Sequence, residues 1–263
     1  MDFLLECIGF PPGTDRDDLI RRVRDQGEPV PWRGDPSSHR RLPLADGLEL
    51  RLDREVDQDF WTLLPHFKVP YRLRVAVESL VAVPDSPFDA LLIGWAAPPA
   101  PEAPESEGEG AYRLAAWLTD ARRLPKRLAR NHVLAVSVAG FALEVSYIGP
   151  NEGVRDRDIL ELPHGAFVAP LTGSDSPGGC SEVSLRVKEI RHLRNPITGL
   201  TVDVLITDAP ERPLMLFLSP WQLFNDGLRQ ARPGWRIEGT FLFTGRIEGG
   251  LPGPKRRLKR AFG

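Results

Sequence analysis

The residues best suited to chemistry in this 263-residue chain are arginines, lysines and tryptophans that lie along segments rich in β-forming residues. Binding of single-stranded nucleic acid needs cationic groups that follow the phosphates and aromatic faces on which bases stack. This chemistry predicts a nucleic-acid-binding surface whose candidate contact residues are Arg72, Arg74, Trp95, Arg113, Trp117, Arg122, Arg123, Lys126, Arg127, Arg186, Lys188, Arg191, Arg194, Lys255, Arg256 and Arg257.

The densest basic segment is DARRLPKRLAR, residues 120–130. Arg122, Lys126 and Arg130 are spaced by four, so a helix here would present a cationic face. Pro125 limits the first part of this predicted helix to a turn. The alternative is a solvated face that pairs with the acidic loop 102–109. For Trp95 and Trp117, the alternative to base stacking is packing of the sheet face against a neighbouring domain.

No local motif for catalysis is visible. The chain lacks GxSxG, a P-loop and GxGxxG, and its five histidines have no metal-ligand spacing (His39, His66, His132, His164 and His192). Cys7 and Cys180 stand alone, which favours buried reduced thiols over a disulfide or zinc site. We therefore expect a protein without metal or cofactor that acts by binding, although ligands gathered from distant segments leave an enzyme open.

Composition and charge set broad limits. The net charge is −2, so the overall field neither demands nor excludes a polyanionic partner. No apolar run approaches the roughly 20 residues of a membrane span, and the first ten residues lack the basic flank of a signal peptide. We expect a soluble, cytoplasmic protein that does not insert into a membrane, of unknown oligomeric state.

Residues 1–60 predict a small α+β unit. Residues 3–8 read as a strand, and Asp15 or its neighbour Thr14 caps a helix over 16–26. The pair Asp46-Gly47 between alternating segments predicts a hairpin of strands 40–44 and 48–52. The leucines of the second strand then share one face, while its polar residues face solvent (Glu49, Arg51 and Asp53).

This N-terminal order of strand, helix and hairpin resembles one module of the glyoxalase/vicinal-oxygen-chelate family. The family places metal ligands on the first and last strands of its modules, where Glu6 and Glu49 fall in this chain. The resemblance implies a metal-dependent enzyme, but such enzymes pair two modules and only one is visible. A solvent-facing strand position explains Glu49 more simply.

The chain also contains one stretch twice, about a hundred residues apart. Residues 112–118 (YRLAAWL) align with 212–218 (RPLMLFL), and residues 138–143 align with 237–242. Each copy predicts strand, strand, strand, helix, strand, strand, with Gly140, Gly239 and Gly245 as bend points between the last strands. This order resembles the OB-fold, a five-stranded Greek-key barrel that commonly binds oligonucleotides or oligosaccharides. The resemblance is at the level of the fold and implies no named family.

The predicted fold is therefore mainly β, with a small α+β N-terminal unit followed by two OB-like five-stranded barrels. The predicted divisions are an N-terminal domain (1–68), barrel 1 (69–150), a linker (151–181), barrel 2 (182–250) and a basic tail (251–263). The function that we expect is non-catalytic binding of single-stranded nucleic acid. The alternative is a structural or protein-interaction subunit whose barrels dock in a larger assembly.

Overall fold

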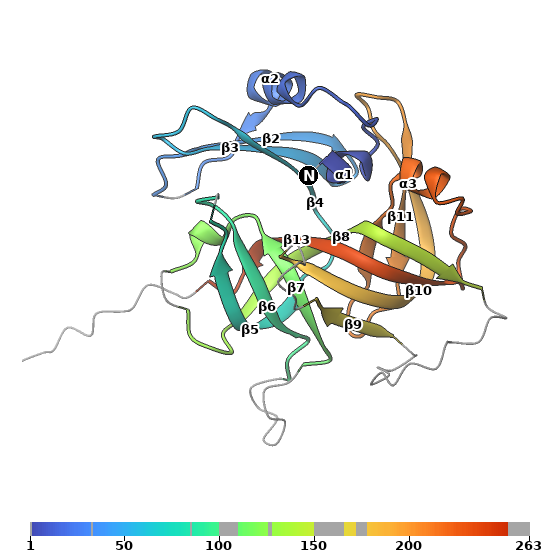
Figure 1. The fold of residues 1–263 in the computed structure, drawn as a ribbon. Helices are drawn as coiled ribbons and strands as arrows, with labels where there is room; N and C mark the ends of the chain where they lie inside the picture. Colours follow the sequence, from blue (N-terminus) through green and yellow to red (C-terminus); the bar gives the residue numbers. More distant parts are fainter. Residues whose placement is uncertain are drawn as a thin grey trace, which may run out of the picture.

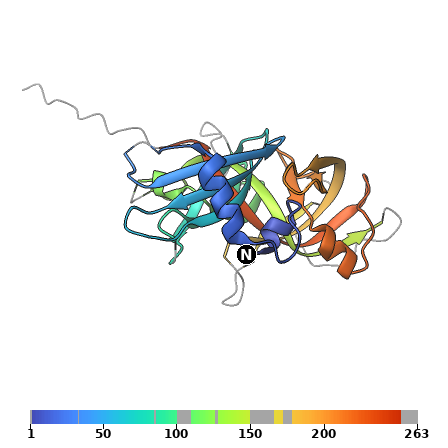
Figure 2. The same ribbon diagram turned by 90° about the horizontal axis from the view of Figure 1, so that it is seen from above.

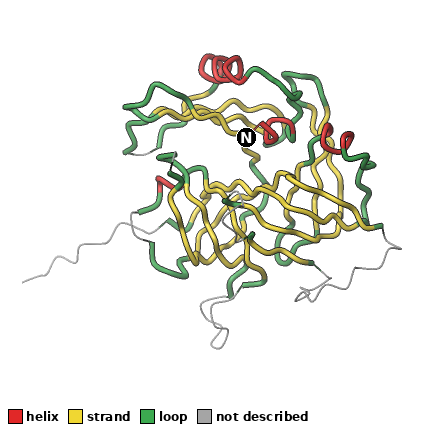
Figure 3. Tube along the Cα trace, viewed as in Figure 1, coloured by secondary structure: helices red, strands yellow, loops and turns green. Residues whose placement is uncertain are grey.

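The computed structural model describes residues 2–32, 34–84, 86–99, 110–125, 128–149, 166–171 and 178–251. These residues form mainly β structure in two sheets, one of four strands and one of nine (Figures 1 and 3). The prediction of a mainly β protein is confirmed, whereas the assignment of OB-type barrels stays a prediction. Among the described residues, no helix is long and apolar enough to cross a membrane.

The N-terminal unit holds the smaller sheet and two helices. Its elements are α1 (Asp2–Glu6), α2 (Arg16–Gln26), β1 (Glu28–Pro29), β2 (Ser38–Ala45), β3 (Leu48–Arg54) and β4 (Thr62–Phe67), and the sheet order is β1-β2-β3-β4. The predicted second helix and hairpin are both present. Asp15 caps α2 by accepting the N–H of Asp17 at 2.9 Å. The hairpin turns at Asp46 and Gly47, whose φ angles are both positive, at 42° and 95°.

The prediction of a strand over residues 3–8 is wrong, because the chain forms α1 there. Leu4, Leu5 and Ile8 are buried, which is the spacing of a helical face. The turn after α1 is held by the second half of the protein, since the amide of Asn195 donates to the carbonyl of Ile8 at 2.9 Å. The apolar pattern of this short stretch fits either a helix or a strand, and packing on a distant segment decides for the helix.

The nine-stranded sheet contains the remaining strands, in the order β11-β12-β8-β5-β6-β7-β13-β10-β9. Their bounds are β5 (Leu73–Ala82), β6 (Ala90–Ala96), β7 (Tyr112–Leu118), β8 (Val133–Ile148), β9 (Phe167–Pro170), β10 (Cys180–Arg194), β11 (Thr201–Thr207), β12 (Leu214–Phe217) and β13 (Arg236–Gly249). Two further pairings, β8 with β13 and β10 with β11, fold this sheet back on itself.

The pairings correspond between the two halves. β5, β6 and β7 pair in succession, and β10, β11 and β12 do the same. β5 is antiparallel to β8, as β10 is to β13. β7, however, is parallel to β13, and β12 is parallel to β8, so each half adds the last strand of the other half to its own strands. Two rings of five strands result, which share β8 and β13 (Figure 1). We call them ring 1 (β5, β6, β7, β13, β8) and ring 2 (β10, β11, β12, β8, β13).

The predicted bends at Gly140, Gly239 and Gly245 do not divide these strands, since β8 and β13 are each continuous. Close packing accounts for two of the glycines. A Cβ at Gly140 would lie 2.7 Å from the Leu216 side chain, and one at Gly239 would lie 2.0 Å from the carbonyl oxygen of Glu144. Gly239 also has φ +150°, beside a bulge at residues 240–241.

The predicted helix over 120–130 is also absent from the described residues. Residues 121–123 form one 3₁₀ turn, η1 (Ala121–Arg123), and no α-helix follows in residues 124–125 or 128–130. Pro125 lacks the N–H that a continuing helix needs, which explains the early end. Arg122 and Arg130 therefore do not lie on one cationic helical face, as their spacing had predicted.

The smaller sheet lies over the larger one, with α2 on its outer side (Figures 1 and 2). The leucines of β3 face the helices and belong to a core that also includes Phe141 and Phe217 of the larger sheet. A second core fills the rings. The opposite, polar face of the smaller sheet consequently meets ring 1, and this junction contains the candidate site.

Candidate functional site

The polar face of β3 is buried rather than solvated. Glu49, Arg51 and Asp53 are only 6%, 9% and 2% exposed, so the expectation that they face solvent is wrong. The alternation of the strand is as predicted, but ring 1 covers its polar face. Buried charges must be paired to avoid a large desolvation penalty, and their partners therefore define the site.

These charges form a network across β2 and β3. The Nδ1 atom of His39 lies 2.6 Å from Oδ1 of Asp53, and Arg51 Nε lies 2.5 Å from Oδ2 of the same carboxylate. Glu49 lies 3.3 Å from Arg41 and 3.6 Å from Arg246 of β13. The network thus joins the N-terminal sheet to ring 1.

Arg51 is the centre of this network. Burial acts to lower the pKa of its guanidinium, but the charges of Asp53 and Asp89 outweigh burial and raise the pKa, so Arg51 stays charged. Its Nη2 lies 4.0 Å from Asp89 on the β5–β6 loop, and neither Nη atom has a hydrogen-bond partner among the described residues. Burial in turn raises the pKa of Asp89, an effect that the Arg51 charge only partly offsets.

His66 of β4 lies on the same face and is neutral. Burial, reinforced by the charges of Arg246 and Arg51, lowers its pKa to about 3. In the part of the chain that the structure describes, neither ring nitrogen has a hydrogen-bond partner. Burial raises the pKa of the neighbouring Glu49, and the charges of Arg41 and Arg246 only partly counter that rise.

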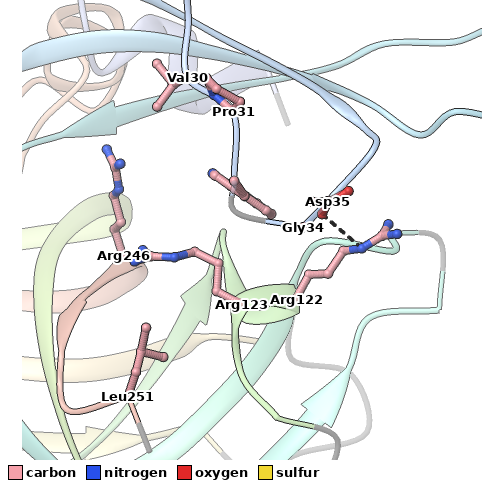
Figure 4. A pocket seen from close by; sticks show the side chains of 9 residues that line it. Val30, Pro31, Gly34, Asp35, Arg122, Arg123, Arg246 and Leu251 are labelled. Carbon is pink, nitrogen blue, oxygen red and sulfur yellow. Dashed lines mark ion pairs between the residues drawn. The ribbon is translucent and has the colours of Figure 1, made fainter. Parts of the chain in front are cut away.

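A cleft of about 430 Å³ opens beside this network (Figure 4). It lies between the β1–β2 segment, η1 and the end of β13. Its lining residues are Val30, Pro31, Trp32, Gly34, Asp35, Arg122, Arg123, Arg246 and Leu251. A smaller cavity of about 20 Å³ adjoins the network and shares Val30, Trp32 and Arg246 with the cleft.

Carboxylates hold the arginines of the cleft in place. Arg123 is 2.6 Å from Asp120 and donates to the carbonyl of Ile247 at 2.8 Å. Arg246 is farther from its two carboxylate partners in the described chain, at 3.6 Å from Glu49 and 4.0 Å from Asp120. Neither carboxylate lines the cleft, so a ligand there would meet the guanidinium groups first.

Arg122 is more strongly neutralised. It pairs with Asp35 at 3.1 Å and closely with Glu55, and Asp35 itself lines the cleft. Burial alone would raise the pKa of Asp35, but hydrogen bonds from Ser37 and the Arg122 charge outweigh burial and lower the pKa. Asp35 is therefore ionised at neutral pH. In Figure 4, this pair lies at one end of the cleft and Arg246 at the other, with Arg123 extending toward Arg246.

Trp32 forms the aromatic wall of the cleft. Its ring stacks on His39 at a centroid distance of 3.8 Å and meets the edge of Phe88 at 5.9 Å. The Arg51 guanidinium lies 5.2 Å from the same ring. These contacts fix the indole while leaving it half-buried at the cleft.

The predicted nucleic-acid contacts are dispersed over the structure. Arg122 and Arg123 line the cleft, whereas Trp117 packs toward the N-terminal unit with its indole nitrogen buried. Arg74, Trp95 and Arg113 lie on adjacent strands, where Trp95 and Arg113 are register partners. Arg113 makes two 2.7 Å hydrogen bonds to Glu78.

The remaining predicted cations are exposed or fall outside the described residues. Arg72 is exposed. Arg186 and Lys188 both pair with Asp208 at 2.8 Å, Arg191 pairs with Glu189 at 2.9 Å, and Arg194 donates to the carbonyl of Gly199. Five predicted contacts lie outside the described residues: Lys126, Arg127, Lys255, Arg256 and Arg257. Most of the predicted linker and of the basic tail also lies outside them.

Sequence reasoning missed most of the cleft. Trp32, Asp35 and Arg246 were not singled out, because the residues that line the cleft come from three separate segments. The stretch VPWRGDP offered one signal, a tryptophan between prolines and a Gly-Asp turn. Arg246 had no such sequence signal, because it alternates with buried residues on a long strand.

The residues named for a metal centre are not brought together on strands. Glu6 lies on α1, where its carboxylate accepts a hydrogen bond from Ser219, and Glu49 lies in the arginine network. In the described part of the chain, no group of three or more His, Cys, Asp or Glu residues could hold a metal ion.

No protein-family model, curated protein or solved structure matches the chain.

Proposed function

We propose that this protein is a non-catalytic binding protein that captures a small anionic ligand in the cleft. The observation that carries the proposal is the convergence of Arg122, Arg123 and Arg246 on one cavity from two separate elements. The cavity volume of about 430 Å³ lies within the range of small-molecule sites. Arginine forms strong charge-assisted hydrogen bonds to phosphate and carboxylate groups, and here its geometry is fixed in advance.

The fold proposed for the scaffold is a pair of OB-like barrels that share their last strands, β8 and β13. The strand order of each ring and its parallel closing pair support this proposal. The cleft then lies beside the connection after the third strand of ring 1, which carries Arg122 and Arg123. The loop between the first two strands supplies Phe88 and Asp89 behind it. Loops beside the barrel are where OB-folds commonly bind.

The test is calorimetric titration with phosphate, pyrophosphate and citrate at low salt. Wild-type protein is expected to bind at least one of them, and Arg246→Gln to weaken that binding about 10- to 100-fold, because one charge-assisted contact is lost. Arg229→Gln, at an exposed position that follows the helix α3 (Pro220–Asn225), is the matched control and should bind as wild type. Failure of wild type to bind any of the three anions at millimolar concentration would refute the proposal.

A second candidate function is binding of single-stranded nucleic acid across the outer face of ring 1. The observation that favours it is the outward row of Arg74, Trp95 and Arg113 on β5, β6 and β7. A labelled 20–30-mer should then bind at about 50 mM salt, and Trp95→Ala should cost about 1–3 kcal/mol of binding. Loss of one phosphate contact in Arg74→Ala should flatten the log–log salt slope by about 0.7. No shift of the oligonucleotide at that salt excludes this candidate.

A further inference from the structure

The cleft has two chemically different walls. Arg123 and Arg246 supply cationic N–H groups, whereas Val30, Pro31 and Leu251 are apolar. In Figure 4, Val30 and Pro31 lie across the cavity from Arg123, and Leu251 lies below Arg123. An inorganic anion would satisfy only the arginines and would leave the apolar wall in contact with water. A ligand that fits both walls must carry an anionic group and an apolar or flat portion.

Trp32 specifies that portion further. Its indole is clamped by His39, Phe88 and Arg51, so it would not need to reorient when a ligand binds. It lines both the 430 Å³ cleft and the 20 Å³ cavity behind it, which places it at their boundary. A fixed, half-buried aromatic side chain is a platform for another flat ring.

The smaller cavity limits where the anionic group can lie. Its volume of about 20 Å³ is room for one water-sized group and not for a phosphate. Its lining combines the carboxylates of Glu49, Asp53 and Asp120 with four arginines, so its size and not its charge excludes a phosphate. The anionic group therefore stays in the larger cleft, where Arg246 lines both spaces and Arg123 extends toward it.

We propose that the ligand of the cleft is a phosphate monoester of a planar ring system, of the kind represented by a nucleoside 5′-monophosphate. Arg123 and Arg246 bind the phosphate, and Trp32 stacks on the ring. This inference rests on the proposed function of the cleft and adds the chemical class of its ligand. The 430 Å³ volume accommodates a molecule of this size.

The experiment compares four probes on the full-length protein by titration calorimetry: inorganic phosphate, ribose 5-phosphate, a nucleoside 5′-monophosphate and the free nucleoside. The monophosphate is expected to bind at least about 10-fold more tightly than ribose 5-phosphate, which lacks the ring. The free nucleoside is expected to show no binding at millimolar concentration, because it lacks the phosphate.

Variants then assign the ring contact. Trp32→Leu should bring the monophosphate to the affinity of ribose 5-phosphate while leaving inorganic phosphate within about twofold of wild type. Trp221→Leu, on the α3 side of the molecule, is the matched control and should change neither. If Trp32→Leu does not fold, the four-probe series on wild type still decides, and Trp32→Phe should keep a preference for the monophosphate.

Two results separate this inference from the function on which it rests. Equal affinity for ribose 5-phosphate and the nucleoside monophosphate would overturn the ring assignment but leave anion capture standing. No binding of any phosphate-bearing probe would overturn both. Binding of a 5′-phosphorylated oligonucleotide without binding of the mononucleotide would also overturn the proposal, because the recognised unit would then be a strand.

Discussion

At the scale of single residues, the feature that distinguishes this protein is a charged interface where most proteins place an apolar one. Arg51 and Asp53 are as buried as core leucines, and they join two sheets. Removing one partner from such a pair leaves an uncompensated charge without water, which costs more than the intact pair contributes. The network therefore makes the relative position of the two sheets sensitive to single substitutions.

Replacement of Asp53 by Asn should lower the free energy of unfolding by about 3–5 kcal/mol, because Arg51 and His39 both lose their closest carboxylate. Urea denaturation measures the change. The matched control is Asp208→Asn, since Asp208 also pairs with two cations, but these are 52% and 50% exposed. The control should lose at most about 1 kcal/mol. Equal losses in the two variants would show that burial does not matter here.

His66 predicts how stability depends on pH. Its pKa in the folded protein is about 3, below the ordinary value of 6.5, so the unfolded chain binds the extra proton first. Stability should therefore fall as pH decreases from about 6.5 toward 3, by up to about 1.4 kcal/mol per pH unit from this group. Raised carboxyl pKa values, such as that of Glu49, act in the opposite direction.

A His66→Gln variant isolates the contribution of this histidine. Denaturation between pH 4.5 and 7 should show a shallower loss of stability on acidification than in wild type. His192→Gln is the control, because the side chain of His192 is 66% exposed, and it should leave the wild-type slope nearly unchanged. An unchanged slope in the His66 variant would contradict the neutral, buried state of this residue.

At the scale of elements, β13 must pass β8 closely along most of its length. Gly239→Ala should destabilise the protein by about 2–4 kcal/mol, because the new Cβ meets the Glu144 carbonyl at 2.0 Å and φ is +150°. Gly249→Ala on the same strand is the control. Its Cβ would meet Ala135 at an ordinary 3.6 Å, so the melting temperature should change little. Similar effects at both positions would mean that the strand relaxes around the new methyl group.

Elements with a local signature were predictable, and those decided by distant contacts were not. The capped helix α2 and the Asp46-Gly47 hairpin have turn and cap residues of their own. α1 depends on packing against the β10–β11 turn, which no window around residues 3–8 contains. For β3, the alternation identified the polar face, but only the assembled fold shows what covers it. The same limit applies to the cleft, whose lining residues converge from three segments.

At the scale of the whole molecule, each ring is completed by a strand from the other half of the sequence. Fragments 69–150 and 182–250 expressed alone should therefore be unfolded or aggregate, since each lacks one strand and leaves pairing edges open. Mixed together, they should recover β structure by circular dichroism and form a complex on size exclusion. A stable, cooperatively melting fragment 69–150 would show that ring 1 does not need β13.

The sharing of β8 and β13 by the two rings also has a consequence for synthesis on the ribosome. Ring 1 closes only when β13 (Arg236–Gly249) pairs with β7, although β5, β6 and β7 are made more than a hundred residues earlier. At typical elongation rates, these early strands wait roughly 5–20 s for their last neighbour. During this interval the nascent chain has an open edge at β7 and an incomplete cleft, because Arg246 has not yet been translated. The proposed ligand-binding cleft is therefore completed late in translation, when β13 closes ring 1.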